Sequence, residues 1–241
     1  VDPVVERFLK EAKFPYAIGY GLTETSPLLA GSGPAITVPG TIGPVMPGVE
    51  LKVLDPDPVT GIGEVAARGP NVMKGYYKDP DMTRAVIDAE GWFRTGDLGS
   101  INEKGRLALK GRSKNMILGA SGENVYPEDI EFVLNQHPYV AESLVVEGEN
   151  SSLVAYVQID GDKYAAASKS DAMSEMGYIL QYKREEIMNE IKFFVNENVN
   201  RFSRIDRVEL IEQFEKTASQ KIKRYLYSIK KTLSGGGVGQ A

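Results

Sequence analysis

The chain has 241 residues, of which 42% are hydrophobic and 25% charged, and its formal net charge is −5, so its composition is that of an ordinary globular protein. The negative balance argues against a general nucleic-acid binder, which needs a basic surface. Cysteine is absent from the sequence, which excludes disulfides, thiolate metal sites and a cysteine nucleophile and fits a reducing, cytoplasmic compartment.

The single histidine, His137, precedes Pro138, where a helix is expected to end and a cation is favourable. This position argues against a serine–histidine–aspartate hydrolase and against a histidine metal site. No apolar stretch approaches the roughly 18–20 residues of a membrane span, and no secretory signal is visible. We therefore expect no transmembrane segment, and leave peripheral membrane association and the oligomeric state open. The chain starts at Val1 without methionine, so we expect it to be a piece of a longer protein.

The first half of the chain reads as one helix followed by short strands. Apolar residues at helical spacing open the chain, and a short strand is predicted over residues 14–18. Between Gly31 and Gly111, glycine and proline recur every few residues around short apolar runs. This texture predicts a small, irregular β-barrel or sandwich, with a hairpin turn over residues 102–105. The runs that predict its strands are residues 51–54, 64–67 and 107–109.

The second half alternates strands and helices, which predicts a compact unit of its own. A helix is predicted over residues 127–136, and strands over residues 143–146, 153–159 and 208–211. A polar, irregular insertion is expected over residues 161–178 and a flexible tail from Ser234. One face of a long amphipathic helix is marked by Ile187, Ile191, Phe194, Val195 and Phe202. The predicted fold class is α+β, with a hinge between the two halves near residues 112–114.

The run from Gly111 to Glu131 carries the densest functional signal. It places Arg112 and Lys114 before a glycine-rich stretch, and then Pro127 with carboxylates as the first turn of a helix. Cations, flexible glycines and a helix start in this order predict a moving segment over an anionic ligand. The alternative interpretation is a charged surface hairpin followed by an ordinary helix.

Five segments in order resemble the adenylate-forming superfamily, and within it the C-terminal half of a long-chain fatty-acid–CoA ligase. They are YGLTETSP (20–27), GWFRTGDLG (91–99), GRSKNMI (111–117), SGENVYPEDIE (121–131) and KIKR (221–224). The resemblance covers residues 1–233. It implies that residues 1–112 end a large adenylation domain with a β-barrel subdomain, that residues 113–233 form the small mobile C-terminal domain, and that residues 234–241 are tail.

The resemblance also implies the reaction. A fatty acid attacks the α-phosphorus of ATP with Mg²⁺, giving an acyl-adenylate and pyrophosphate. The thiol of coenzyme A then attacks the adenylate, giving a thioester and AMP, and the small domain rotates between the two steps.

In the first motif the resemblance places Tyr20 and Gly21 against the adenine, and Thr23 and Glu24 at the phosphates. Glu24 would hold Mg²⁺, a hard cation that needs only one or two protein oxygens when a triphosphate supplies the rest. The alternative is a turn after a strand, in which Thr23 or Thr25 caps a helix.

The resemblance assigns Asp97 to the ribose hydroxyls, because an acceptor-only side chain suits two vicinal donors. Arg112 should approach the ribose or the phosphates, and Lys114 occupies the hinge position. Gly119 and Gly122 belong to the loop that faces the active site in the thioester-forming state, where glycine admits the pantetheine arm. The alternatives are an aspartate in a β-turn for Asp97 and a solvated surface side chain for Arg112.

Lys221 matches the catalytic lysine of adenylation, whose ammonium would bridge the carboxylate and the α-phosphate. The alternative is a solvated basic helix, because Lys223, Arg224, Lys230 and Lys231 follow it. The sequence also departs from the family here, since Gln220 precedes the lysine where glycine or leucine is usual.

The serine-, threonine- and glycine-rich phosphate loop of the family is not found in this sequence. We therefore expect negligible ligase activity from the chain alone. Two other hypotheses stay open: another adenylate-forming enzyme, such as an aryl or medium-chain ligase or a carrier-loading domain, and a non-catalytic nucleotide-binding regulatory module.

Overall fold

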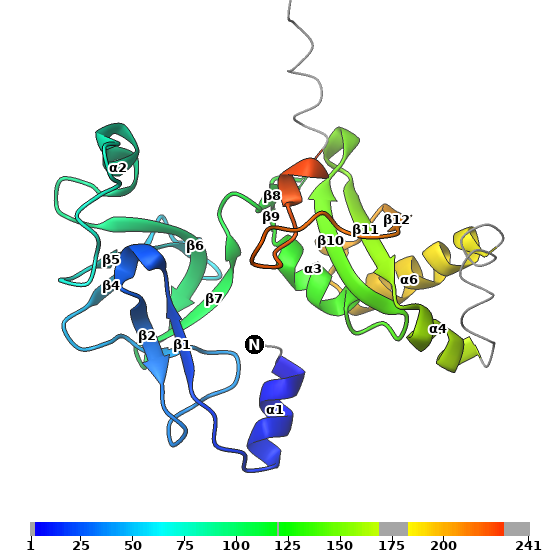
Figure 1. Ribbon diagram of the computed structural model, residues 1–241, viewed down its shortest axis with the longest axis horizontal. Helices are drawn as coiled ribbons and strands as arrows, with labels where there is room; N and C mark the ends of the chain where they lie inside the picture. Colours follow the sequence, from blue (N-terminus) through cyan, green and yellow to red (C-terminus); the bar gives the residue numbers. More distant parts are fainter. Residues whose placement is uncertain (1–2, 120, 169–182, 229–241) are drawn as a thin grey trace, which may run out of the picture. The chain divides into compact units, whose positions relative to one another are not determined.

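The computed structural model describes residues 3–119, 121–168 and 183–228. The chain divides into two compact units, Val1–Lys114 and Asn115–Ala241, and each is described by itself (Figure 1). Among the described residues, no helix has the length and apolar character needed to cross a membrane.

The first unit is built on a five-stranded antiparallel sheet in the order β3-β7-β6-β5-β4. Its strands are β3 (Gly43–Pro44), β4 (Glu50–Leu54), β5 (Gly63–Arg68), β6 (Phe93–Ile101) and β7 (Arg106–Arg112). The α+β class is confirmed, and the three predicted runs lie in β4, β5 and β7. In the described pairing, β3 and β4 remain the two edges, so the strands predicted to form a small barrel make an open sheet instead.

A two-stranded hairpin packs with this sheet. Strand β1 (Ile18–Gly21) pairs antiparallel with β2 (Leu28–Ser32), and the short 3₁₀ helix η1 (Thr23–Thr25) lies between them. Helix α2 (Pro80–Val86) precedes β6, and the Asp79 carboxylate caps it by accepting from the Met82 N–H. The core of the unit consists of Tyr20, Leu29, Ala30, Val65, Ala67 and Leu107.

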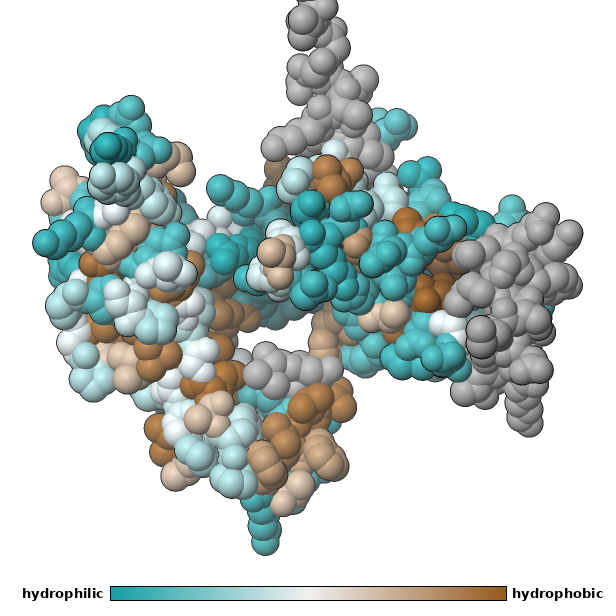
Figure 2. Space-filling model, in the orientation of Figure 1, coloured by the Kyte–Doolittle hydropathy of each residue, from teal (hydrophilic) through white to brown (hydrophobic). Residues whose placement is uncertain are grey.

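Helix α1 (Pro3–Glu11) turns a carboxylate inward and apolar side chains outward. Glu6 is 2% exposed, and its Oε2 accepts from the Gly40 N–H at 2.8 Å. Val4, Val5 and Phe8 are all exposed, Phe8 by 65%. Figure 2 shows the resulting hydrophobic surface over this helix.

The second unit has a three-stranded sheet that is covered on both faces. Strand β10 (Val140–Glu147) pairs antiparallel with β11 (Leu153–Ile159), and β11 pairs parallel with β12 (Arg207–Ile211). Helices α3 (Pro127–Leu134) and α6 (Arg184–Asn198) share one core with Val145, Ala155 and Val157. Leu144, Val146 and Val154 point to the other face, against Phe214 of the segment after β12. Burial on both faces explains why these strands read as continuous apolar runs.

Several short elements complete the second unit. Strands β8 (Ile117–Leu118) and β9 (Asn124–Val125) form a short antiparallel hairpin before α3. Three 3₁₀ helices, η2 (Glu149–Ser151), η3 (Arg201–Ser203) and η4 (Arg224–Leu226), connect or follow the strands.

Three further sequence predictions need correction. The first strand was expected over residues 14–18, but β1 begins only at Ile18, because its partner β2 ends at Ser32, the residue that pairs with Ile18. Phe14 lies before the strand and is 60% exposed.

The insertion expected to be irregular starts as helix α4 (Gly161–Ser168). The Asp160 carboxylate accepts from the Lys163 N–H at 3.1 Å, as a helix cap does, and the buried Tyr164 ring packs 4.9 Å from Tyr139. The rest of that prediction, from residue 169 on, and the predicted tail lie outside the described residues.

Helix α6 buries Ile187, Ile191 and Val195, so its amphipathic spacing is confirmed, but Phe202 does not continue this face. The helix ends at Asn198. The Asn200 side chain then accepts from the Phe202 and Ser203 N–H groups and starts η3, which leaves Phe202 40% exposed.

Candidate active site

Three of the predicted site residues, Tyr20, Asp97 and Arg112, meet in the first unit. Strands β6 and β7 pair Asp97 with Arg112, and Tyr20 comes from β1. The Tyr20 hydroxyl donates to Asp97 Oδ2 at 2.6 Å, and Arg112 Nε lies 2.8 Å from Oδ1. Asp97 is 8% exposed, whereas the Arg112 side chain is 52% exposed. The arrangement is a buried carboxylate held from two sides, by a tyrosine hydroxyl and by a half-exposed guanidinium.

The protonation of Tyr20 follows from its surroundings. Burial raises the pKa of Tyr20 well above its usual range, and the hydrogen bond to Asp97 raises it further. The hydroxyl therefore stays protonated and acts as a donor at neutral pH.

The backbone beside Asp97 is fixed by two residues that the sequence prediction missed. Glu64 Oε1 accepts from the Gly96 N–H at 3.2 Å, and the Ser113 N–H donates to the Gly96 carbonyl at 2.9 Å. Gly96 has φ +72°, a conformation that favours glycine. The Thr95 hydroxyl also accepts from the Asp97 N–H. These contacts set the direction in which the Asp97 carboxylate points.

The YGLTETSP segment is a tight turn that contains the short 3₁₀ helix η1. The buried Thr25 accepts from the Leu22 N–H at 2.9 Å and donates to the Pro27 carbonyl at 2.6 Å. A Cβ at Gly21 would lie only 1.6 Å from the Pro27 oxygen, so glycine is required there. Thr25 thus has the structural role, whereas Thr23 is exposed.

Glu24 lies in the same turn and is held by residues of the loop after β5. The Tyr76 hydroxyl donates to Glu24 Oε1 at 3.1 Å, and the Met73 N–H donates to the Glu24 carbonyl at 2.8 Å. Burial and the Glu24 carboxylate raise the pKa of Tyr76, which therefore remains a donor. No cluster of three or more acidic or histidine side chains suited to a metal occurs among the described residues.

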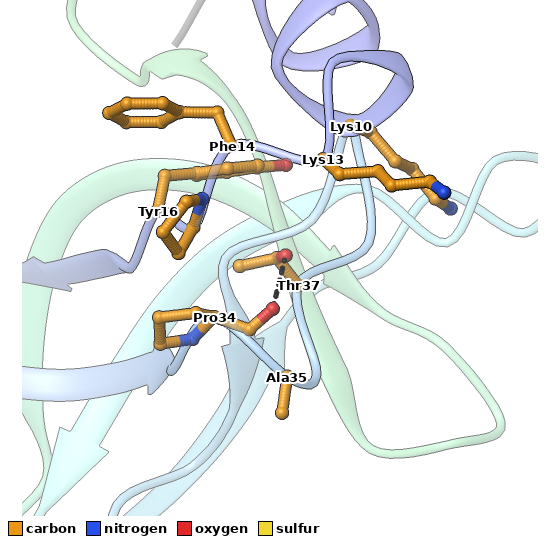
Figure 3. A pocket seen from close by; sticks show the side chains of 8 residues that line it. Lys10, Lys13, Phe14, Tyr16, Pro34, Ala35 and Thr37 are labelled. Carbon is orange, nitrogen blue, oxygen red and sulfur yellow. Dashed lines mark hydrogen bonds between the residues drawn. The ribbon is translucent and has the colours of Figure 1, made fainter.

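Two of the cavities among the described residues lie in the first unit, and neither is lined by a predicted site residue. One, of about 390 Å³, lies between the end of α1 and residues 34–37 and is lined by Lys10, Lys13, Phe14 and Tyr16 among others (Figure 3). The other, of about 590 Å³, is lined by residues of the segment 74–84. Tyr76 lines the second cavity and also contacts Glu24.

The predicted hinge and glycine loop lie at the boundary of the units. Lys114 is the last residue of the first unit and is exposed. Gly119 and Gly122 close a turn between β8 and β9, in which the Gly122 N–H donates to the Gly119 carbonyl at 2.9 Å. Gly122 has φ +85°, and a Cβ there would meet nothing within 4 Å. The turn is therefore open to an approaching group on the Gly122 side.

Lys221 belongs to the second unit and lies in a turn. Of the basic helix that was the alternative, Lys230 and Lys231 lie outside the described residues. The Thr217 N–H donates to the Lys221 carbonyl at 2.8 Å, and the side chain is exposed. Arg224 is more strongly held than Lys221: its side chain is 23% exposed and contacts Glu131 at 2.8 Å. The structure thus separates the run into an exposed lysine and an anchored arginine.

Family models match both parts of the chain. A model described as AMP-binding enzyme matches residues 1–77, and one described as AMP-binding enzyme C-terminal domain matches residues 129–221.

Curated relatives include plant acid–CoA ligases. A 4-coumarate–CoA ligase 2 of Oryza sativa subsp. japonica is 33% identical over 88% of this chain and 37% of its own length. A 4-coumarate–CoA ligase 1 of Glycine max is 34% identical over 88% of this chain and 71% of its own length. The peroxisomal long chain acyl-CoA synthetase 7 of Arabidopsis thaliana is 36% identical over 67% of this chain and 25% of its own length. The chain spans 37% and 38% of the length of the first two relatives it matches.

Solved structures share the fold. O-succinylbenzoate coenzyme A synthetase of Bacillus subtilis in complex with AMP has a TM-score of 0.74 at 25% identity, over 100% of this chain and 45% of its own. ATP-bound MatB of Rhodopseudomonas palustris has a TM-score of 0.68 at 27% identity, over 88% of this chain and 39% of its own.

Proposed function

Because the chain belongs to the AMP-binding enzyme family of the adenylate-forming superfamily, we propose that it is part of an ATP-dependent acid–CoA ligase. Such an enzyme activates a carboxylate as its adenylate and transfers the acyl group to coenzyme A. The observation that carries the proposal is the buried Asp97 carboxylate, held between the Tyr20 hydroxyl and the Arg112 guanidinium.

Asp97 keeps capacity for a ribose. Each carboxylate oxygen has about two acceptor positions. Tyr20 occupies one position on Oδ2, and Arg112 occupies one on Oδ1. Two acceptor positions therefore remain for the vicinal hydroxyls of a nucleotide. Arg112 uses its Nε for Asp97, and its half-exposed guanidinium retains further donors for a phosphate.

Glu24 and Thr23 are assigned to the phosphate end. A single carboxylate fits Mg²⁺ that takes its other ligands from phosphate oxygens and water. When bound, the ion would neutralise phosphate charge, and the Tyr76 hydroxyl would orient the Glu24 carboxylate by its bond to Oε1. The exposed Thr23 hydroxyl would donate to the α-phosphate.

In this proposal the second unit is the domain that moves between the two half-reactions. Lys221, exposed on its turn, would bring its ammonium to the reacting carboxylate and α-phosphate, where negative charge develops. Lys114 would serve as the hinge. The open side of the Gly122 turn would admit the pantetheine arm of coenzyme A in the second step.

The acid substrate has two candidates. A long-chain fatty acid is the first, supported by the likeness to a long chain acyl-CoA synthetase and to a long-chain-fatty-acid–[acyl-carrier-protein] ligase of Arabidopsis thaliana. A 4-coumarate-type aryl acid is the second, supported by the likeness to 4-coumarate–CoA ligases of several plants. A carrier protein as acyl acceptor is the corresponding alternative to coenzyme A, and a cytoplasmic location stays a prediction.

A nucleotide titration tests the proposal on the chain itself. We expect AMP to shift the ¹H–¹⁵N NMR signals of Asp97 and Arg112, and the 2′,3′-dideoxy analogue to leave them unchanged. Asp97→Asn should abolish the effect, and Asp162→Asn, an exposed change in the second unit, should not. Equal shifts with both nucleotides, or none with AMP at millimolar concentration, would overturn the ribose assignment.

A ligase assay tests whether the 241-residue chain has activity by itself. With ATP, Mg²⁺, coenzyme A and either palmitate or 4-coumarate, we expect negligible turnover from the 241-residue chain. Turnover near that of a typical full-length ligase would contradict this expectation.

A further inference from the structure

Lys221 lies at the tip of a small hairpin formed by residues 215–223. The Lys223 N–H donates to the Glu215 carbonyl at 2.8 Å, and Lys216 and Ile222 pair across the two arms. Residues 217–221 at the tip are largely exposed. The hairpin therefore depends on contacts at its base for a defined position.

Arg224 fastens the arm that follows Lys221. One guanidinium nitrogen donates to the Val145 carbonyl at 2.7 Å, and another contacts both carboxylate oxygens of Glu131 at 2.8 and 2.9 Å. Glu131 in turn accepts from the Val145 N–H at 2.7 Å. Arg224 and Glu131 together bind both polar groups of one residue in β10. Figure 1 shows the segment that contains Arg224 beside this strand.

The electrostatics make this contact specific for arginine. The Glu131 side chain is 13% exposed, and burial raises its pKa while the Arg224 charge opposes that rise. A planar fork can satisfy a carboxylate and a carbonyl at once, which the single ammonium of lysine cannot do in the same geometry. Arg224 is also only three residues from Lys221, so the path of the intervening backbone is short.

A second contact fastens the other arm. Lys216 Nζ donates to Glu142 Oε1 at 2.8 Å, and Glu142 lies in β10 as well. Phe214, just before the hairpin, is 2% exposed among the apolar side chains of the outer sheet face. Both arms are thus attached to the same strand, and the tip extends beyond them.

We propose that Arg224 and Lys216 are positioning residues, which hold the hairpin on β10 so that Lys221 is presented on a rigid support. The inference rests on the proposed function only for the role of Lys221; the attachment of the hairpin stands on the contacts alone.

Amide hydrogen exchange on the chain itself tests the attachment. In Arg224→Gln, the Thr217 and Lys223 amides, which close the hairpin, should exchange about tenfold faster or more. Without the contact to Glu131, local opening of the hairpin costs less free energy. The Ala155 and Val157 amides of β11 should keep their rates. A matched control is Arg207→Gln, which removes an ion pair with Glu209 on β12, and the hairpin amides should not respond.

Arg224→Gln leaves the Glu131 carboxylate buried without its cation, so a second variant separates positioning from folding. In Arg224→Gln/Glu131→Gln the stranded charge is gone, and the amide oxygen introduced at that position can still accept from the Val145 N–H. We expect the unit to recover stability while the hairpin amides stay fast. Arg224→Lys should restore protection only in part. Hairpin amides at wild-type rates in the double variant would overturn the proposal.

A full-length family member that carries these residues tests the consequence. Arg224→Gln should lower kcat for ATP–pyrophosphate exchange and leave KM for ATP nearly unchanged, because the proposed ribose and Mg²⁺ contacts, Asp97 and Glu24, lie in the first unit. If Lys221→Ala leaves the exchange unchanged, the assigned role of Lys221 fails while the attachment stands. If Lys221→Ala abolishes it and Arg224→Gln does not alter it, the positioning role is refuted.

Discussion

The Tyr20 hydroxyl donates a 2.6 Å hydrogen bond to the Asp97 carboxylate, across 77 positions of sequence. This bond ties the β1–β2 hairpin to the central strand of the five-stranded sheet. It also places two residues of separate motifs at one point, where Arg112 adds the charge. The same contact therefore serves the fold and the proposed ribose site.

Tyr20→Phe removes this donor and leaves the ring. We expect the free energy of unfolding to fall by about 1–3 kcal/mol, because a buried carboxylate oxygen loses its partner. Urea denaturation measures the change. Tyr77→Phe is the matched control, since Tyr77 is 87% exposed, and it should have no effect. Equal stability of the two variants would contradict a structural role for the Tyr20 hydroxyl.

Glu64 offers a paired comparison. Glu64→Ala removes the acceptor for the Gly96 N–H and should cost about 1–2 kcal/mol of stability. Glu64→Gln keeps an acceptor and loses mainly the ion pair with Arg94, whose side chain is 48% exposed, so it should stay within about 1 kcal/mol of wild type. Thermal and urea unfolding check both variants. If Glu64→Gln loses as much stability as Glu64→Ala, the ion pair with Arg94, and not the contact with the Gly96 N–H, stabilises the unit.

The burial of His137 predicts that the second unit becomes less stable to unfolding at acidic pH. Its ring is 4% exposed, Nδ1 accepts from the Tyr139 N–H at 3.3 Å, and burial lowers its pKa while Glu190 opposes the shift. The unfolded chain thus takes up the proton first as pH falls. The stabilising contribution is complete above the ordinary histidine pKa of about 6.5 and is lost as pH falls through the lowered folded value.

Urea unfolding between about pH 7.5 and pH 5 should show this loss, with a slope of no more than about 1.4 kcal/mol per pH unit for one proton. His137→Asn keeps an acceptor near the Nδ1 position and cannot titrate in this range. It should be less stable at neutral pH, because it loses the ring contacts with Tyr139 and Phe194, but it should lack the histidine component of the slope. Identical slopes would rule out His137 as the titrating group.

Lys221→Ala tests the division of labour in a full-length family member. Adenylate formation should fall about 10²–10³-fold, the usual cost of removing a donor to developing charge. Thioester formation from supplied acyl-adenylate should be spared, because that step has no attack on phosphorus. The two half-reactions are measured separately by pyrophosphate exchange and by thioester release, and an equal loss in both would contradict the assigned role.

The strands of the second unit could be predicted because both sides of their sheet are covered. Residues 143–146 and 153–159 contain apolar side chains that point alternately to two cores, so the sequence shows an unbroken run. Helix α4 was missed, because the cap at Asp160 and the burial of Tyr164 depend on contacts that composition does not reveal.

The sequence named three residues that the structure brings together, but it did not name the residues that support them. Asp97, Arg112 and Tyr20 lie in short motifs with a resemblance to a known family. Glu64 acts through strand register, which leaves no local pattern. Arg224 ends the KIKR motif, but its partner Glu131 lies 93 positions away, so its supporting contact is not visible in the sequence. Thr25 shows the same limit in a turn, since only the structure separates its buried hydroxyl from the exposed Thr23.

Helix α1 places Glu6 against the first unit and leaves Val4, Val5 and Phe8 outside, the reverse of the usual amphipathic arrangement. These apolar side chains are exposed beside the charged Arg7, Lys10 and Glu11, and an exposed apolar surface of this kind favours association. Self-association of the chain should therefore increase with its concentration. Replacing Phe8, which is 65% exposed, by a charged residue should reduce this association.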